Sequence, residues 1–187
     1  MSDDLLIRHD GGVTTLTINR PPLNLMTLGL LRDIVAALEM LAGRDETRAI
    51  VIRGAGTRAF CAGADLKSGD EGNPASAGAL RAVGMRMIDL IEEHPKPVIS
   101  AVQGWCIGGG TDLVLCADLI VAGEGARFGY PPSRVWGTPT TAMWVYRMGL
   151  EQAKRYMLTG DEISARKAVE IGLILEAVPD AELADHA

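Results

Sequence analysis

The sequence predicts an α/β protein that folds as one domain. Short apolar runs that suit buried strands alternate along the chain with longer amphipathic stretches that suit helices. The 187 residues are 48% hydrophobic, with a mean hydropathy of +0.15, which is enough for one well-filled core. No internal repeat, low-complexity tract or linker divides the chain, so we expect a single core domain over residues 1–187.

The N-terminal part predicts a hairpin, a helix and a further strand. Leu5–His9 and Val13–Asn19 alternate between apolar and polar residues, and the turn between them holds two glycines. Thr27 predicts the N-cap of a helix that runs to Ala42, because apolar residues recur within it at helical spacing. Ala49–Arg53 is a short apolar strand.

The middle of the chain predicts a long glycine-containing loop, a helix and a buried strand. Residues 76–93 are amphipathic at helical spacing, and two prolines end the pattern. Val98–Val102 is the next strand. A glycine triplet follows, and a helix of about nine residues is expected from Thr111.

The C-terminal part predicts two short strands, three helices and a last strand. In order, these elements are Leu119–Ala122, Ala126–Phe128, Thr138–Gly149, Glu151–Leu158, Ala165–Ile171 and Leu173–Val178. Ser164 is expected to cap the last of the three helices.

Composition excludes several classes of partner. The net charge is −6 and no basic stripe is present, so we expect no nucleic-acid partner. No apolar run is long enough to span a bilayer and no secretory signal is visible, so we expect no membrane partner. The three cysteines are odd in number and lack CxxC spacing, which favours the cytoplasm and predicts neither a disulfide framework nor a metal site.

Two glycine loops share one design. "FCAGADL" (Phe60–Leu66) and "IGGGTDL" (Ile107–Leu113) each follow a strand, and the second enters a helix. Backbone N–H groups at a helix N-terminus lack intrahelical acceptors, so two such loops side by side would form an oxyanion hole. Alternatively, the glycines only permit tight turns. A phosphate-binding loop is not expected, because GxGxxG and GxxxxGK[ST] are both absent.

Four stretches together resemble the crotonase family, also called the enoyl-CoA hydratase/isomerase family. They are "LTINRPPLNLMT", "AIVIRGAGTRAFCAGADL", "PKPVISAVQGWCIGGGTDLVLCADLIVAGEGARFGYP" and "YMLTGDEISARKAVEIGLILEAVP". The resemblance implies a spiral of ββα units, an acyl-CoA thioester as substrate, and a homotrimer or hexamer. Coenzyme A enters as part of the substrate, and no separate cofactor is implied. The family's C-terminal helical segment would lie beyond "VPDAELADHA" and is expected to be missing from this chain.

The same resemblance assigns roles to individual residues. The two oxyanion N–H groups belong to Ala64 and Gly109, and their neighbours Gly63 and Gly108 would lie against the substrate. Contacts with coenzyme A are implied for Asn24, Leu25, Met26, Arg58 and Ala62. Simple packing, or a solvated surface position for Arg58, explains these five nearly as well.

The chain departs from the family at the catalytic acids. Hydratases of the family resemble one another in using two glutamates, since adding water across a double bond needs a base and an acid. Asp112 stands at the first position, where it is either the catalyst or only a helix-start acid, and Asp65 is expected to be a helix-start acid. The second position holds Pro132, which transfers no proton, and a further family position for an acid holds Thr140. Isomerase-like or other enolate chemistry is therefore favoured over two-acid hydration.

Three residues flank the position of the missing acid. Tyr130 either donates a hydrogen bond to the substrate or only packs, and Arg134 either clamps a carboxylate or forms a structural salt bridge. Trp136 is expected to be a pocket wall. The alternative function is a catalytically weak or inactive CoA-thioester-binding protein. An RNA-binding relative is disfavoured by the negative net charge.

Overall fold

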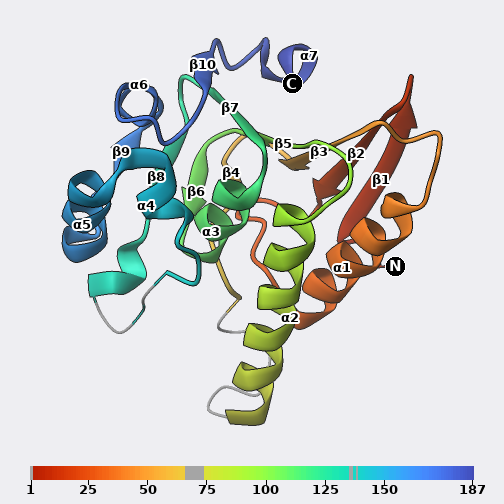
Figure 1. Cartoon of the computed structure of the whole chain (residues 1–187), viewed down its shortest axis with the longest axis horizontal. Helices are drawn as coiled ribbons and strands as arrows, with labels where there is room; N and C mark the ends of the chain where they lie inside the picture. Colours follow the sequence, from red (N-terminus) through yellow and green to blue (C-terminus); the bar gives the residue numbers. More distant parts are fainter. Residues whose placement is uncertain (1, 66–73, 135–136, 138) are drawn as a thin grey trace.

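The computed structural model describes residues 2–65, 74–134, 137 and 139–187, and these form two β-sheets with helices packed on them (Figure 1). In this part of the chain six strands make up the larger sheet, in the spatial order β1, β2, β3, β5, β7, β10. They span Leu5–Asp10, Val13–Ile18, Ala49–Gly54, Val98–Val102, Leu119–Gly123 and Glu176–Val178. The hairpin β1–β2 is antiparallel, and every later pairing in this sheet is parallel.

The smaller sheet has the order β4, β6, β8, β9 among the described residues. Its strands are Ala59–Cys61, Trp105–Ile107, Arg127–Gly129 and Ile163–Ser164. The sequence predicts only the third of these, one residue early. Strands of two or three residues are too short to show an alternating pattern, so β4, β6 and β9 escape prediction.

Three successive segments of the chain repeat one arrangement. β3 and β4 lead into α2 (Pro74–Glu92), β5 and β6 lead into α3 (Gly109–Cys116), and β7 and β8 follow in the same way. Each segment therefore adds one strand to each sheet, parallel to the previous one. This confirms the predicted α/β spiral of ββα units.

The helices begin and end largely where the sequence predicts. α1 (Leu28–Ala42) is capped by Thr27, whose hydroxyl accepts from Leu30 N at 3.1 Å, and it ends at Gly43. Ser164 caps α6 in the same way, accepting from Lys167 N at 3.3 Å. The remaining helical segments are η1 (Pro131–Arg134), α4 (Met143–Met148), α5 (Leu150–Thr159), α6 (Ala165–Glu170) and α7 (Leu183–His186).

Two helix starts differ from the prediction. α3 begins at Gly109, two residues before Thr111, because Thr111 N already donates to the carbonyl of Gly108. The helix expected over Thr138–Gly149 begins only at Met143, with Ala142 as the N-cap, and Thr141 Oγ1 accepts from the Met143 nitrogen at 3.1 Å. Thr138 itself lies outside the described residues.

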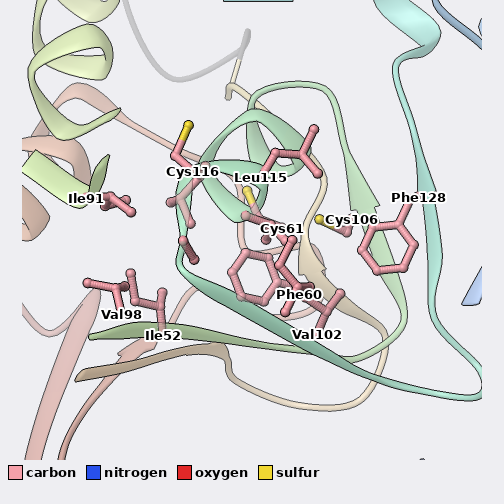
Figure 2. Packing of buried hydrophobic residues seen from close by; sticks show 14 of the residues in the cluster. Ile52, Phe60, Cys61, Ile91, Val98, Val102, Cys106, Leu115, Cys116 and Phe128 are labelled. Carbon is pink, nitrogen blue, oxygen red and sulfur yellow. The ribbon is translucent and has the colours of Figure 1, made fainter. Parts of the chain in front are cut away.

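The core lies between the larger sheet and the helices α1, α2 and α3, and it continues into the smaller sheet. Figure 2 shows part of it, with Phe60, Cys61, Cys106 and Leu115 packed together. All three cysteines are buried and free, as the sequence predicts for small buried residues. No helix in the described ranges is long and apolar enough to cross a membrane.

The opposite face of the larger sheet carries a smaller apolar cluster. Leu183 of α7 packs there against Val51, Ala101 and Val121 of three neighbouring strands. The last described helix therefore covers the outer face of the sheet, away from α1 and α2 (Figure 1).

Candidate active site

The two glycine loops lie against each other at the ends of β4 and β6. Gly63 (φ +93°) follows β4 and Gly108 (φ +59°) follows β6, and both values lie in the region that favours glycine. A Cβ atom on Gly63 would lie 3.8 Å from the Gly109 nitrogen, and one on Gly108 would lie 4.0 Å from the Gly63 Cα. The pairing of β4 with β6 therefore places the two loops side by side, so close that one added Cβ atom would touch the opposite loop.

The N–H group of Ala64 points away from the protein chain beside it. Met26 forms a parallel bridge with Ala64, in which Met26 N donates to Gly63 O at 2.9 Å and Asp65 N donates to Met26 O at 2.8 Å. N–H groups of successive residues in an extended segment point to opposite sides, so that of Ala64 points away from Met26. No acceptor for it is found among the described residues.

Gly109 supplies a second N–H group as the first residue of α3, with Gly108 as the N-cap. The N–H groups of Thr111 and Asp112 donate to the Gly108 carbonyl, whereas that of Gly109 donates to no residue in the described ranges. Such groups lie at the positive end of the helix dipole and attract negative charge. The two loops thus offer two N–H donors close to each other.

Asp112 lies one turn into α3, and only 1% of it is exposed. Its Oδ2 atom accepts from Thr140 N (3.0 Å) and Thr140 Oγ1 (2.8 Å), and its Oδ1 atom accepts from Trp144 Nε1 (3.0 Å). Burial raises the pKa of Asp112 above 3.8, and the three donors oppose that rise because they stabilise the ionised form. The carboxylate is therefore held rigidly beside the glycine loops.

Sequence reasoning missed Thr140 and Trp144 as partners of this acid. They lie 28 and 32 residues from Asp112 along the chain, and no local pattern links them to it. The sequence does hold one signal for Trp144. A buried indole N–H needs an acceptor, and Asp112 is one of the few acidic residues in an apolar stretch.

Pro132 and Tyr130 both lie at the site. A Cβ atom on Gly108 would lie 3.5 Å from Pro132 Cγ, so the proline ring packs on the glycine loop. Tyr130 is 7% exposed and stands edge-on to the Trp144 ring, with 6.3 Å between ring centroids. Burial, and then the charge of Asp112, raises the pKa of Tyr130 to about 12. Its phenol therefore stays protonated at neutral pH and can donate.

The structure places Arg134 away from the acid. Its Nε atom donates to the Thr159 carbonyl at 2.7 Å, and its NH2 atom pairs with Asp161 at 3.0 Å. Arg134 thus has the surface ion pair that the sequence left open as its alternative role. Trp136 lies outside the described residues.

The five residues assigned to coenzyme A surround the first glycine loop in different ways. Asn24 is fully buried, and its amide donates to two backbone carbonyls at 2.9 and 2.8 Å, while the Met26 side chain belongs to the core. Leu25 and Ala62 are half-buried and Arg58 is exposed. Because the side chains of Asn24 and Met26 are buried, a ligand could contact these two residues only through their backbone.

Asp65 has a partner that the sequence does not reveal. Its Oδ2 atom pairs with the Arg20 guanidinium at 3.2 Å, and Arg20 also donates to the Leu25 carbonyl at 2.6 Å. The helix that Asp65 was expected to start would fall on residues outside the described ranges. The ion pair ties the segment after Ala64 to the loop that follows β2.

Comparisons with known proteins agree with this geometry. The model of the family "Enoyl-CoA hydratase/isomerase" matches residues 8–187. The short-chain-enoyl-CoA hydratase of Clostridium acetobutylicum is 31% identical over 189 residues, which cover 99% of this chain and 72% of that protein. The crotonyl-CoA hydratase of Syntrophomonas wolfei is also 31% identical, over 97% of this chain and 71% of that protein.

Solved structures match equally well. An enoyl-CoA hydratase from Bacillus anthracis gives a TM-score of 0.95 at 31% identity, covering 98% of this chain and 73% of that one. An enoyl-CoA hydratase from Mycobacterium smegmatis gives a TM-score of 0.92 at 33% identity, covering 99% and 74%. The chain therefore belongs to the enoyl-CoA hydratase/isomerase family, the crotonase family that its motifs resemble.

Proposed function

We propose that the chain is an acyl-CoA-binding enzyme that stabilises a thioester enolate between the N–H groups of Ala64 and Gly109. The observation that carries this proposal is the close approach of the two glycine loops, each with an N–H group that meets no acceptor among the described residues. Relatives named short-chain-enoyl-CoA hydratase and crotonyl-CoA hydratase support a CoA thioester as substrate. Coenzyme A is part of that substrate, and we propose no separate cofactor.

The chemistry follows from where negative charge develops. When a base removes a proton from the α-carbon, the electron pair moves to the thioester oxygen. Two N–H donors aimed at that oxygen stabilise the charge, and one such donor is typically worth about 10²–10³ in rate. Return of a solvent-derived proton to the same carbon gives exchange, and return of a proton to another carbon gives isomerisation.

Asp112 is the acid that we propose for the proton transfer. Pro132 supplies no second acid, because its ring holds no titratable group. Tyr130 keeps its proton near neutral pH, so its hydroxyl can donate a hydrogen bond and does not act as the base. One base with one oxyanion hole suits enolate formation and isomerisation better than rapid hydration.

The oxyanion hole is tested by removing one N–H group. Gly109 is the first residue of α3, where proline is tolerated, so Gly109→Pro deletes the donor and keeps the helix start. Gly109→Ala is the matched control, because its Cβ would meet no atom within 4 Å. The assay is exchange of the α-hydrogens of butanoyl-CoA into deuterated water, followed by mass spectrometry.

We expect exchange with the parent and with Gly109→Ala, and a loss of about a hundredfold with Gly109→Pro. Circular dichroism and urea unfolding establish that the proline variant is folded. Equal exchange rates in a folded Gly109→Pro variant would overturn the oxyanion assignment.

The second candidate function is CoA-thioester binding without turnover, which the absence of an acid at Pro132 favours. Asp112→Asn separates the two candidates. Loss of exchange with retained butanoyl-CoA binding supports the enzyme. A parent protein that binds butanoyl-CoA and catalyses neither exchange nor hydration of crotonyl-CoA supports the binding protein.

From the family resemblance we also propose a cytoplasmic homotrimer or hexamer. Light scattering during size-exclusion chromatography measures the mass of the assembly. A monomeric mass would contradict this part of the proposal.

A further inference from the structure

We propose that Thr140 is a positioning residue that blocks Asp112 Oδ2 and leaves Oδ1 as the atom that takes the α-proton. The inference rests on the proposed function and identifies the reacting atom within it. An ionised carboxylate has about four lone-pair sites, two on each oxygen. Thr140 fills both sites of Oδ2 with its backbone N–H and its hydroxyl, and Trp144 fills one site of Oδ1. Within the described residues, one site on Oδ1 remains.

The hold on the carboxylate is geometrically strong. Thr140 holds Oδ2 with two donors, its backbone N–H at 3.0 Å and its hydroxyl at 2.8 Å. The third donor belongs to a ring that is 1% exposed and packs edge-on against Tyr130. Rotation of the Asp112 carboxylate would break all three bonds, so the free site of Oδ1 keeps one direction.

The titratable groups near Asp112 do not set its ionisation, because most of them stay protonated. Tyr130 follows β8, Cys106 lies on β6 and Cys116 lies one turn further along α3, and burial keeps all three protonated. Among the described residues, Glu92 at the end of α2 accepts from the Thr141 hydroxyl at 3.5 Å. Hydrogen bonds to the charged form are therefore what opposes the burial of Asp112.

The proton step balances without a further reactant. The C–H bond at the thioester α-carbon breaks, its proton goes to Oδ1, and its electron pair moves to the thioester oxygen. The reverse step returns a proton, or a deuteron from solvent, to carbon. Thr140 touches only Asp112 in this scheme and acts through it.

The test removes the hydroxyl of Thr140 and keeps its shape. Thr140→Val retains the backbone N–H and puts a methyl group in place of the hydroxyl that donates to Asp112 Oδ2 at 2.8 Å, at a residue that is exposed as a whole. We expect butanoyl-CoA exchange to slow about tenfold, because Oδ2 loses one of the two charge-assisted hydrogen bonds that hold the carboxylate in one orientation. The half-saturating concentration of butanoyl-CoA should stay unchanged.

Two further measurements separate positioning from a structural role. The acid limb of the rate profile should move to higher pH, because losing a donor to the charged form raises the pKa of Asp112. A ¹³C NMR titration of the Asp112 carboxyl, assigned with Asp112→Asn, should move in the same direction. Thr140→Ser should restore the parent rate and profile. Thr159→Val is the control, because in the described part of the chain the Thr159 hydroxyl donates to the Arg155 carbonyl and accepts from the Asp161 nitrogen, and it contacts no residue of the candidate site.

The outcomes are distinguishable. If Thr140→Val matches the parent in rate and profile while Asp112→Asn loses exchange, this inference is wrong and the proposed function stands. If the carboxyl pKa rises and exchange is unchanged, Thr140 does not direct the reaction and the inference is again wrong. If the parent shows no exchange, the proposed function fails and this inference fails with it.

Discussion

The properties of Asp112 depend on residues that lie far from it along the chain. Its place after the glycine triplet made it a candidate from the sequence, as Ala64 and Gly109 were. Burial, and the donors from Thr140 and Trp144, exist only in the folded chain. The sequence therefore predicts which residues gather at the site, and it does not predict how the acid is held.

Burial of Asp112 predicts a pH dependence of stability. Its pKa in the folded state is raised above 3.8, so the folded state holds its proton to higher pH than the unfolded state does. This contribution to the unfolding free energy is fully present below pH 3.8 and is lost as pH rises through the folded pKa. As pH rises from 3.8 through the folded pKa of Asp112, we expect the unfolding free energy of the parent to fall relative to that of Asp112→Asn. Near neutral pH, the two unfolding free energies should change with pH in the same way.

Urea unfolding of both proteins from about pH 4 to about pH 7 measures the difference. The hydrogen bonds that the asparagine variant lacks shift its unfolding free energy by a constant amount, and they do not change how the difference between the two proteins depends on pH. If the unfolding free energy of the parent increased with pH relative to that of Asp112→Asn, the pKa of Asp112 would not be raised in the folded state.

The elements around the site were predicted unevenly. α1 and its cap, and the strands β1, β2, β3, β5 and β7, follow from periodicity and turn residues. β4 and β6 have three residues each, and they form strands only because each finds a partner from a distant segment. Tertiary pairing therefore creates the elements that carry the two glycine loops.

The junction of α3 with β4 predicts opposite effects for two adjacent glycines. A Cβ atom on Gly110 would lie 2.4 Å from the Cys61 carbonyl oxygen, so alanine there must push β4 away from α3. A Cβ atom on Gly109 would meet nothing within 4 Å. We expect Gly110→Ala to lower the unfolding free energy by about 1–3 kcal/mol.

Gly109→Ala should match or slightly exceed the stability of the parent, because alanine restricts the unfolded chain. Urea titration of the two variants checks both expectations. Equal stabilities would mean that the close approach of α3 to β4 does not constrain position 110.

At the scale of the molecule, the family resemblance predicts the spiral, and local patterns alone predict only the α/β class. The smaller sheet explains the limit, because its four strands come from segments that the sequence separates by many residues. The packing of α7 on the outer face was also not predicted, since one turn of helix has no visible periodicity.

The outer face gives a prediction for the whole fold. Leu183 is 6% exposed and lies on three strands of the larger sheet. We expect Leu183→Ala to lower the unfolding free energy by about 2 kcal/mol or more, because it opens a cavity over the sheet. Leu175→Ala is the matched control, since that side chain is 57% exposed and should change stability by about 0.5 kcal/mol or less. Equal losses in thermal or urea unfolding would contradict a stabilising contact between Leu183 and the sheet.

The buried thiols make the junction of β4, β6 and α3 measurable in the unmodified protein. Cys61 and Cys106 are fully enclosed, and burial raises the pKa of Cys61 to about 12, so hardly any thiolate forms in the closed state. A thiol reagent can label these cysteines only while the junction is open. The labelling rate therefore reports how often the structure opens next to the two N–H donors. Slower labelling with butanoyl-CoA present would show a ligand holding that junction shut, without a mutation and without any turnover.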